Sequence, residues 1–337
     1  MIEPIRLDEI TRAAEIIESE AIQTPLVHSA QLDEIVGATV VCKVESLQRT
    51  GSFKFRGAIH RLSIIPEADR TLGVVAVSSG NHGAAVACAA QILGMKATIH
   101  IPMDTPDAKR QLIESFDADI VTFDRLIPDR EAPARTQAAE TGAIFIHPFE
   151  DRNVMIGQGT AALELHRQIT AQHQQPLDVL VVPMSGGGLM AGCGSAMSAL
   201  APDCELIGVE PELADDTARS FATGRLVRIE QPSTIADGLA ITSPGTNTFA
   251  LNQQLVSEVL TVTEKSIVEA MRVIRDNLGL QVEPSGATAL AAVLDRSGPE
   301  SRWSGLTIGV IISGGNVDMT RYDELLELGA GGRVDQG

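Results

Sequence analysis

The chain is poor in cysteine, and the few cysteines it has are not arranged as a metal-binding or redox-active pair. Cys42, Cys88, Cys193 and Cys204 have no CxxC spacing, and Cys42 and Cys88 lie inside apolar runs. Cysteines of this kind are typical of buried free thiols in a reducing compartment. The pattern therefore predicts a cytoplasmic protein.

An excess of basic residues is also missing. The chain has 26 Lys and Arg residues against 44 Asp and Glu residues, which gives a net charge of -18. Nucleic acids and anionic membrane surfaces bind to basic faces, so neither is expected as a partner. A small anionic ligand remains compatible with this charge where backbone N–H groups supply the attraction.

Long apolar runs and low-complexity tracts are absent as well. No stretch approaches the roughly 18 uninterrupted apolar residues that span a bilayer, and the N-terminus has no apolar signal core. The composition, with 44% apolar and 21% charged residues, is that of an ordinary soluble globular protein. Only the tail at 331–337 is expected to be flexible.

What the sequence does contain is a regular alternation of apolar, β-rich segments with helical ones. Strands are expected at 38–44, 73–77, 96–101, 119–123, 143–146, 178–183, 205–209 and 306–313. Helices are expected at 81–93, 106–115, 130–140, 157–172 and 189–200. This alternation predicts a doubly wound α/β architecture, in which ligands bind beyond the carboxyl ends of the strands. The length fits two domains or one large unit.

The first candidate segment is Thr50–Gly57, at the junction between a turn and a helix. Lys54 lies there between Phe53 and Phe55. Desolvation by these rings would lower the pKa of the amine, which favours attack on a carbonyl group. Taken alone, the segment fits a solvated surface lysine better.

The second candidate segment, 78–83, follows the strand expected at 73–77. Ser78, Ser79 and Asn81 bring two hydroxyls and an amide to the start of a helix, a combination that suits a carboxylate and a ring oxygen. A well-capped helix start explains the segment equally well. His82 by itself is more typical of a structural histidine.

Two further segments follow apolar strands. Gly186, Gly187 and Gly188 precede Leu189 and a helix, so backbone N–H groups can surround a phosphate with no Cβ in the way. A tight structural turn is the alternative. The GxGxxG spacing and the acidic ribose partner of a dinucleotide site are missing. Ser313 ends the last strand, where it could bind a ring nitrogen or simply belong to a turn.

Together these segments resemble the serine/threonine dehydratase and serine racemase family, which belongs to the tryptophan-synthase-like, fold type II pyridoxal-phosphate enzymes. The matching segments begin at 24–26, continue through 45–54 and end at 313–316. The resemblance implies two doubly wound, open-sheet α/β domains with the cofactor in the cleft between them. It implies a large cofactor-binding domain at 1–49 and 146–330 and a small mobile domain at 50–145. It also implies a homodimer, and no appended regulatory domain is expected.

The resemblance further implies roles for individual residues around pyridoxal 5'-phosphate. Lys54 is expected as the Schiff-base lysine and as the base. The other cofactor-binding residues are expected to be Phe53 on the ring face, Asn81 on the ring hydroxyl, Gly186, Gly187, Gly188 and Leu189 on the phosphate, Ser313 on the ring nitrogen, and Gly238 and Glu283 in the pocket wall.

The implied substrate is a small amino acid. Ser79 is expected to act on the face of the substrate α-carbon opposite Lys54. The residues expected to contact the substrate are Ser78, Ser79, Asn81, His82 and Arg130. A surface arginine is an equally good interpretation of Arg130.

The segment 210–216 resembles the divalent cation loop of the same family. Glu210 and Asp216 would supply carboxylates and Ala214 a backbone carbonyl to Mg²⁺ or Ca²⁺. Without the resemblance, the segment is only an acidic helix start.

These roles predict an ammonia-lyase that converts L-threonine or L-serine to a keto acid and ammonia. A neutral serine at the ring nitrogen favours elimination, and Ile241 suits the threonine methyl group. Ser79 also permits racemisation, so a serine racemase is an alternative, as is a 3-hydroxyaspartate dehydratase. The segments 55–57 and 185–188 argue against β-replacement of the cysteine synthase type. A binding protein without catalysis would have no reason to combine Lys54 with Asn81 and Ser313.

The segment 115–119 departs from the family pattern. Relatives commonly carry a glycine before this strand, whereas the sequence here is Ser-Phe-Asp-Ala-Asp. The departure leaves the conformation of this loop open but does not affect the chemistry.

Overall fold

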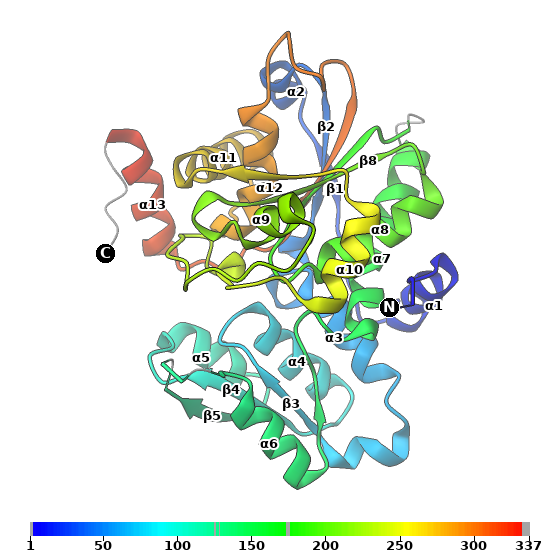
Figure 1. Cartoon of the computed structure of the whole chain (residues 1–337), viewed down its shortest axis with the longest axis vertical. Helices are drawn as coiled ribbons and strands as arrows, with labels where there is room; N and C mark the ends of the chain where they lie inside the picture. Colours follow the sequence, from blue (N-terminus) through cyan, green and yellow to red (C-terminus); the bar gives the residue numbers. More distant parts are fainter. Residues whose placement is uncertain (1–2, 125, 128, 173–175, 332–337) are drawn as a thin grey trace.

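The computed structural model describes residues 3–124, 126–127, 129–172 and 176–331, and these residues contain two separate β-sheets (Figure 1). The larger sheet has the order β1-β2-β10-β7-β8-β9. Its strands are β1 (Leu26–His28), β2 (Thr39–Val44), β7 (Val179–Pro183), β8 (Glu205–Pro211), β9 (Glu258–Val262) and β10 (Thr307–Ile312). β1 runs antiparallel to β2, and the remaining neighbours are parallel.

Helices cover both faces of the larger sheet because its central strands are apolar on both sides. In β2, Val40 and Cys42 face one core while Val41 faces the other. The helices on the first face are α2 (Ala30–Val36), α11 (Glu264–Leu278), α12 (Pro284–Asp295) and α13 (Met319–Gly331). The helices on the second face are α1 (Leu7–Ile17), α7 (Arg152–Gln172), α8 (Gly188–Leu200) and α10 (Thr246–Leu255).

The smaller sheet is parallel throughout and has the order β5-β4-β3-β6. Its strands are β3 (Val74–Val77), β4 (Ala97–Pro102), β5 (Asp119–Phe123) and β6 (Ile144–Phe145). Val74 and Ala76 pack in a core with α3 (Lys54–Ser63), α4 (Asn81–Ile92) and α5 (Asp107–Glu114). Val75 points to the other face and packs against α6 (Ala132–Thr141). In Figure 1 this unit forms the lower part of the molecule.

The predicted fold class is confirmed, since both sheets have helices on both faces. All eight expected strands occur, and β1 and β9 are additional. The strands of the smaller sheet lie between Val74 and Phe145. The exact domain boundaries remain a prediction, and most of the tail predicted as flexible lies outside the described residues.

The loop before β5, whose sequence departs from the expected glycine, contains a residue in the left-handed conformation. Asp117 has a φ of 58°, which is the left-handed conformation that glycine adopts most easily. Aspartate is among the residues that tolerate this conformation, so the turn forms without glycine.

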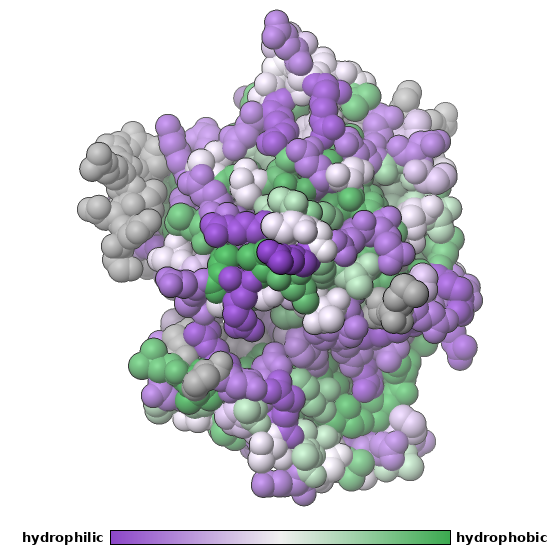
Figure 2. Space-filling view, in the orientation of Figure 1, coloured by the Kyte–Doolittle hydropathy of each residue, from purple (hydrophilic) through white to green (hydrophobic). Residues whose placement is uncertain are grey.

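In the view of Figure 2, hydrophilic side chains are spread over the whole face, with hydrophobic and intermediate ones between them. Among the residues that the structure describes, no helix is both long enough and apolar enough to span a membrane.

Candidate active site

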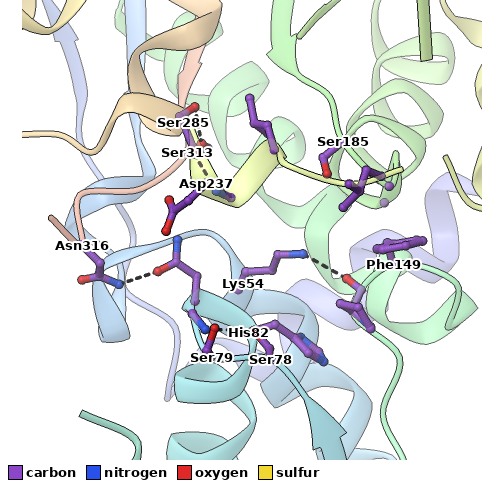
Figure 3. Close-up of a pocket in the computed structure, with 18 of the residues that line it drawn as sticks. Lys54, Ser78, Ser79, His82, Phe149, Ser185, Asp237, Ser285, Ser313 and Asn316 are labelled. Atoms are coloured by element: carbon purple, nitrogen blue, oxygen red, sulfur yellow. Dashed lines mark hydrogen bonds between the residues drawn. The ribbon is translucent and has the colours of Figure 1, made fainter. Parts of the chain in front are cut away.

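A cavity of about 330 Å³ lies between the two sheets and is lined by residues from both sides (Figure 3). Cavities of this size hold small ligands and cofactors. The lining includes every residue that the sequence predicted for cofactor or substrate binding: Phe53, Lys54, Ser78, Ser79, Asn81, His82, Arg130, Gly186, Gly187, Gly188, Leu189, Gly238, Glu283 and Ser313. The structure therefore brings these residues together in one cavity.

Lys54 is the first residue of α3, and its amine points into the cavity in Figure 3. The Nζ atom donates a hydrogen bond to the carbonyl oxygen of Pro148 at 3.1 Å and lies 5.1 Å from the centroid of the Phe53 ring. Burial lowers the pKa of this amine to about 8. A larger share of Lys54 is therefore neutral, and thus nucleophilic, than of an exposed lysine at the same pH.

The position of Lys54 is fixed by buried charges on the opposite side of α3. The guanidinium of Arg56 donates hydrogen bonds to both carboxylate oxygens of Glu45, at 2.7 and 2.8 Å, and to Glu164 at 3.1 Å. Arg56 and Glu45 are fully shielded from water. On the cavity side, the backbone N–H of Phe53 donates to the carbonyl of Ser313. The start of α3 is thus held to the segments that directly follow β2 and β10.

The loop between β3 and α4 presents hydroxyl and amide groups to the cavity. The amide of Asn81 donates a hydrogen bond to Glu283 at 2.7 Å, and its oxygen accepts one from Asn316 at 2.8 Å. These two contacts fix the orientation of the Asn81 amide. Burial, with a smaller contribution from the charge of Asp237, raises the pKa of Glu283 to about 8.

His82 is buried behind this loop. Its Nε2 atom lies 3.0 Å from the carbonyl oxygen of Ile146, so Nε2 carries the hydrogen. Burial lowers the pKa of His82 to about 3. The ring is therefore neutral near pH 7 and offers no positive charge to a substrate carboxylate.

In the glycine segment after β7, Gly186–Gly188, no side chain of the segment itself covers the backbone at the start of α8. A Cβ on Gly186 would lie 2.2 Å from the ring of Phe149, and Gly187 has a φ of 86° that disfavours other residues. Thr248 and Asn252 donate hydrogen bonds to the carbonyl oxygens of Gly186 and Gly187. The N–H groups at the helix start have no partners within the helix, and such groups bind phosphate.

Ser313 and Gly238 form another part of the wall, next to Ser285. The Ser313 hydroxyl donates a hydrogen bond to the Ser285 carbonyl at 3.3 Å and is almost fully buried. The N–H of Gly238 donates to the Ser285 hydroxyl at 3.0 Å. Ser313 thus presents a neutral hydroxyl group at the end of β10.

Several lining residues were not singled out from the sequence, namely Lys109, Phe149, Asp237, Ser285 and Asn316. Asn316 ends the matching segment 313–316 and Asp237 directly precedes Gly238, so the sequence held a signal for both. Lys109 and Phe149 reach the cavity only through the packing of distant segments, and nothing in the local sequence marks them.

The predicted cation site lies outside the lining of this cavity, at the end of β8. Glu210 lies in β8, Ala214 in the following turn, and Asp216 begins α9 (Asp216–Thr223). One carboxylate oxygen of Glu210 and both of Asp216 are buried without a hydrogen-bond partner among the described residues. Burial raises the pKa of Glu210 to about 9 and that of Asp216 to about 7. Two desolvated carboxyl groups with free oxygens fit a divalent cation.

Three-residue clusters that could hold a metal ion do not occur among the His, Cys, Asp and Glu side chains that the structure describes. The predicted site differs from such clusters because it relies on two carboxylates and one backbone carbonyl. Glu210 and Asp216 are thus the two side chains of the predicted ligand set, and the carbonyl of Ala214 is its third oxygen.

Residues 17–314 match the family model described as pyridoxal-phosphate dependent enzyme, so the chain belongs to this family. Within it, the chain falls among ammonia-lyases and racemases that act on small amino acids. It is 44% identical to the L-threo-3-hydroxyaspartate ammonia-lyase of a Pseudomonas species, over 95% of this chain and 98% of the relative. It is 35% identical to the L-threonine ammonia-lyase of Thermotoga maritima, over 96% of this chain and 79% of the relative.

Comparison with solved structures identifies the same family. The structure of maize serine racemase superimposes with a TM-score of 0.90 at 36% identity, and the match covers 96% of this chain and 98% of the racemase chain. The chain is therefore an enzyme that uses pyridoxal phosphate.

The residues of the cavity fit this cofactor. The glycine segment at the start of α8 would hold its phosphate, Lys54 its aldehyde carbon and Ser313 its ring nitrogen. The fit rests on the backbone at Gly186–Gly188, where a Cβ would collide with Phe149, Thr248 or Asn252, and on the amine of Lys54 in the same cavity.

Proposed function

We propose that this chain is an ammonia-lyase for β-hydroxy α-amino acids, with L-threonine, L-serine and 3-hydroxyaspartate as candidate substrates. The observation that carries the proposal is the single cavity in which the amine of Lys54 lies together with the 78–82 loop and the neutral hydroxyl of Ser313. The Pseudomonas and Thermotoga relatives, whose names give 3-hydroxyaspartate and threonine, support the same reaction class.

Pyridoxal phosphate, when bound, supplies an electron-accepting ring that makes the α-proton of an amino acid acidic. Lys54 then takes this proton as a general base. Its pKa of about 8 suits this role, because an amine with a pKa near the working pH can both accept and return a proton.

The substrate carboxylate belongs at the loop before α4. Ser78 and Ser79 supply hydroxyl groups there, and the N-terminus of α4 adds unpaired N–H groups and a favourable dipole. Because His82 is neutral, these neutral donors orient the carboxylate. Ile241 lies in the wall of the same cavity, where its apolar side chain can contact the methyl group of threonine.

The choice between elimination and racemisation depends on two serines. Ser313 is a neutral group that does not enforce protonation of the ring nitrogen, and this favours prompt loss of the β-hydroxyl group. Ser79 enters the cavity from another element than Lys54 (Figure 3). If Ser79 acts there as a second acid or base, the enzyme can also racemise serine. The similarity to maize serine racemase supports this second activity.

The proposal is tested by measuring keto-acid release from L-threonine, L-serine, D-serine and the diastereomers of 3-hydroxyaspartate. We expect release from at least one L-isomer by protein that carries the visible absorbance of its cofactor. The Lys54→Ala variant should lose both the visible band and turnover. A wild-type protein with the bound cofactor that releases keto acid from none of these compounds would refute the proposal.

We also propose that Glu210, Asp216 and the carbonyl of Ala214 bind Mg²⁺ or Ca²⁺. The buried carboxylate oxygens without partners support this, because an uncompensated buried carboxylate is costly. Added cation should raise the Tm of chelator-treated protein, and the Glu210→Gln variant should lose most of this response. Glu212→Gln, in the turn that carries Ala214 but outside the ligand set, is the control. An equal response in wild type and Glu210→Gln would contradict the site.

A further inference from the structure

The peptide group between Pro148 and Phe149 is hydrogen-bonded to a side chain on each of its two sides. Its carbonyl oxygen accepts a hydrogen bond from the Lys54 amine at 3.1 Å (Figure 3), and its N–H donates to Nδ1 of His147 at 3.2 Å. The N–H and C=O of this trans peptide lie in one plane and point in opposite directions. Because His147 fixes the N–H, it also fixes the direction of the carbonyl oxygen.

The ring of His147 is held in the tautomer that can accept this hydrogen bond. Nδ1 also accepts the N–H of Glu150 at 2.9 Å, so this nitrogen carries no hydrogen. The hydrogen lies on Nε2, which is 3.1 Å from a carboxylate oxygen of Glu131. This contact lowers the pKa of Glu131, so the carboxylate stays charged and keeps Nε2 as the donor. The contacts together fix the tautomer and the rotation of the ring.

The turn that contains this peptide is anchored independently on its C-terminal side. The backbone N–H of Asn247, at the start of α10, lies 3.1 Å from each carboxylate oxygen of Glu150. The carboxylate of Asp151 caps the first turn of α7. Loss of the His147 side chain would therefore leave the path of the chain largely in place, while the peptide group before Phe149 would become free to rotate.

The direction of the Pro148 carbonyl matters for proton transfer by Lys54. It supplies the one hydrogen bond that the Lys54 amine makes to the described part of the chain. A neutral amine has a single lone pair, so a hydrogen bond from one of its hydrogens limits the directions that the lone pair can take. Once the amine has taken a proton, a carbonyl oxygen binds the charged form more strongly. The carbonyl thus orients Lys54 before the transfer and stabilises it afterwards.

We propose that His147 is a positioning residue for the proton transfers of Lys54. It acts through the Pro148 carbonyl, because its own ring lies outside the lining of the cavity. This role rests on the proposed function, in which Lys54 is the general base. The acceptor atom Nδ1 carries the effect, and the size of the ring does not.

Two substitutions separate the acceptor atom from the ring. His147→Asn keeps an acceptor oxygen near the position of Nδ1 but loses the ring, whereas His147→Phe keeps a ring without an acceptor. The measured quantity is kcat for the best L-substrate of the keto-acid assay, in protein that carries the visible absorbance of its cofactor. His147→Phe should lower kcat at least about tenfold with a smaller change in KM, and His147→Asn should keep most of kcat.

A second measurement follows the proton transfer itself. Substrate deuterated at the α-carbon should react more slowly than ordinary substrate. The ratio of the two rates should be larger in His147→Phe than in wild type, because removal of the α-proton becomes the slow step, whereas His147→Asn should resemble wild type. His166→Phe, the same exchange on α7 outside the cavity lining, should leave kcat and the ratio unchanged. If His147→Phe binds no cofactor, His147→Leu replaces it with the same expected result.

A ring that merely fills the space between Phe145 and Phe149 would give the opposite order. His147→Phe would then be close to wild type and His147→Asn impaired, which overturns the inference. Equal losses of kcat in both variants with an unchanged isotope ratio would overturn it as well. In either case an active wild type shows that only the role of His147 fails. If wild type turns over none of the compounds, the proposed function fails with it.

Discussion

At the scale of single residues, the chemistry depends on the surroundings of Lys54. Burial gives this amine a pKa of about 8 instead of the ordinary 10.5. The neutral, reactive form of Lys54 therefore becomes dominant above about pH 8. For an exposed lysine, the same change would occur more than two pH units higher.

This difference predicts how protein freed of its cofactor takes it up again. The initial rate at which visible absorbance returns after pyridoxal phosphate is added should rise steeply between about pH 6.5 and 8.5 and level off above about pH 9. Stopped-flow absorbance measures this profile, and Lys54→Ala supplies the baseline. A rate that still climbs beyond about pH 10 would show that the amine is solvated and ordinary.

Ser79 provides the second prediction at this scale. Ser79→Ala should reduce conversion of L-serine to D-serine at least tenfold, because the second proton donor is lost, while keto-acid release from L-threonine stays measurable. Chiral chromatography and a keto-acid assay follow the two products. Ser78→Ala is the comparison, since Ser78 accepts a hydrogen bond from the N–H of Gly80 and shapes the same loop. Parallel loss of both activities in Ser79→Ala would exclude the two-face scheme.

The residues that could be predicted from the sequence are those that belong to motifs. Lys54, Asn81 and Ser313 follow recognisable patterns at strand ends, so their meeting in one cavity could be expected. Lys109 has no such pattern and reaches the cavity through the packing of α5. The fixed orientation of the Asn81 amide, between Glu283 and Asn316, likewise depends on contacts more than 200 residues apart in sequence.

At the scale of secondary-structure elements, α3 is the element whose position matters most for the site. Its first turn carries Lys54 toward the cavity, and Arg56 anchors the other side to Glu45 and Glu164. These charges are buried in pairs. Removing one partner leaves an uncompensated charge without water, which is much more costly than losing a surface ion pair.

Arg56→Met should therefore lower the free energy of unfolding by about 3–5 kcal/mol. Arg321→Met, which removes an exposed arginine paired with Glu324, should change it by less than about 1 kcal/mol. Urea unfolding followed by circular dichroism measures both variants. Similar values for the two would show that the buried cluster contributes no more than a surface pair.

The sequence predicted all strands of the smaller sheet and the central strands of the larger one, but not the two edge strands of the larger sheet, β1 and β9. Buried central strands such as β7 and β10 are continuous apolar runs and are easy to recognise. β1 has only three residues, and β9 alternates exposed and buried positions, so neither forms such a run. Their place is decided by pairing with β2 and β8, which is a tertiary effect.

At the scale of the whole molecule, the site exists because residues from two separate sheets and their helices line one cavity. Lys54 and Asn81 come from helices that pack on the smaller sheet, whereas the glycine segment and Ser313 follow strands of the larger one. The sequence indicated a cleft between two units and the motif residues that line it, but not residues such as Lys109 and Phe149, which the packing of distant segments brings there. The homodimer and the cytoplasmic location remain predictions.

A cofactor that contacts both units should stabilise both. Protein saturated with pyridoxal phosphate at about 100 times the dissociation constant should gain about 2.7 kcal/mol over the cofactor-free form, by mass action. Calorimetry should show a higher Tm, and hydrogen exchange should slow in both the 78–83 and the 186–189 segments. Pyridoxal without the phosphate should protect the 186–189 segment much less, because that protection depends on N–H groups that bind phosphate. Protection confined to one segment would mean that the cofactor does not bridge the cavity.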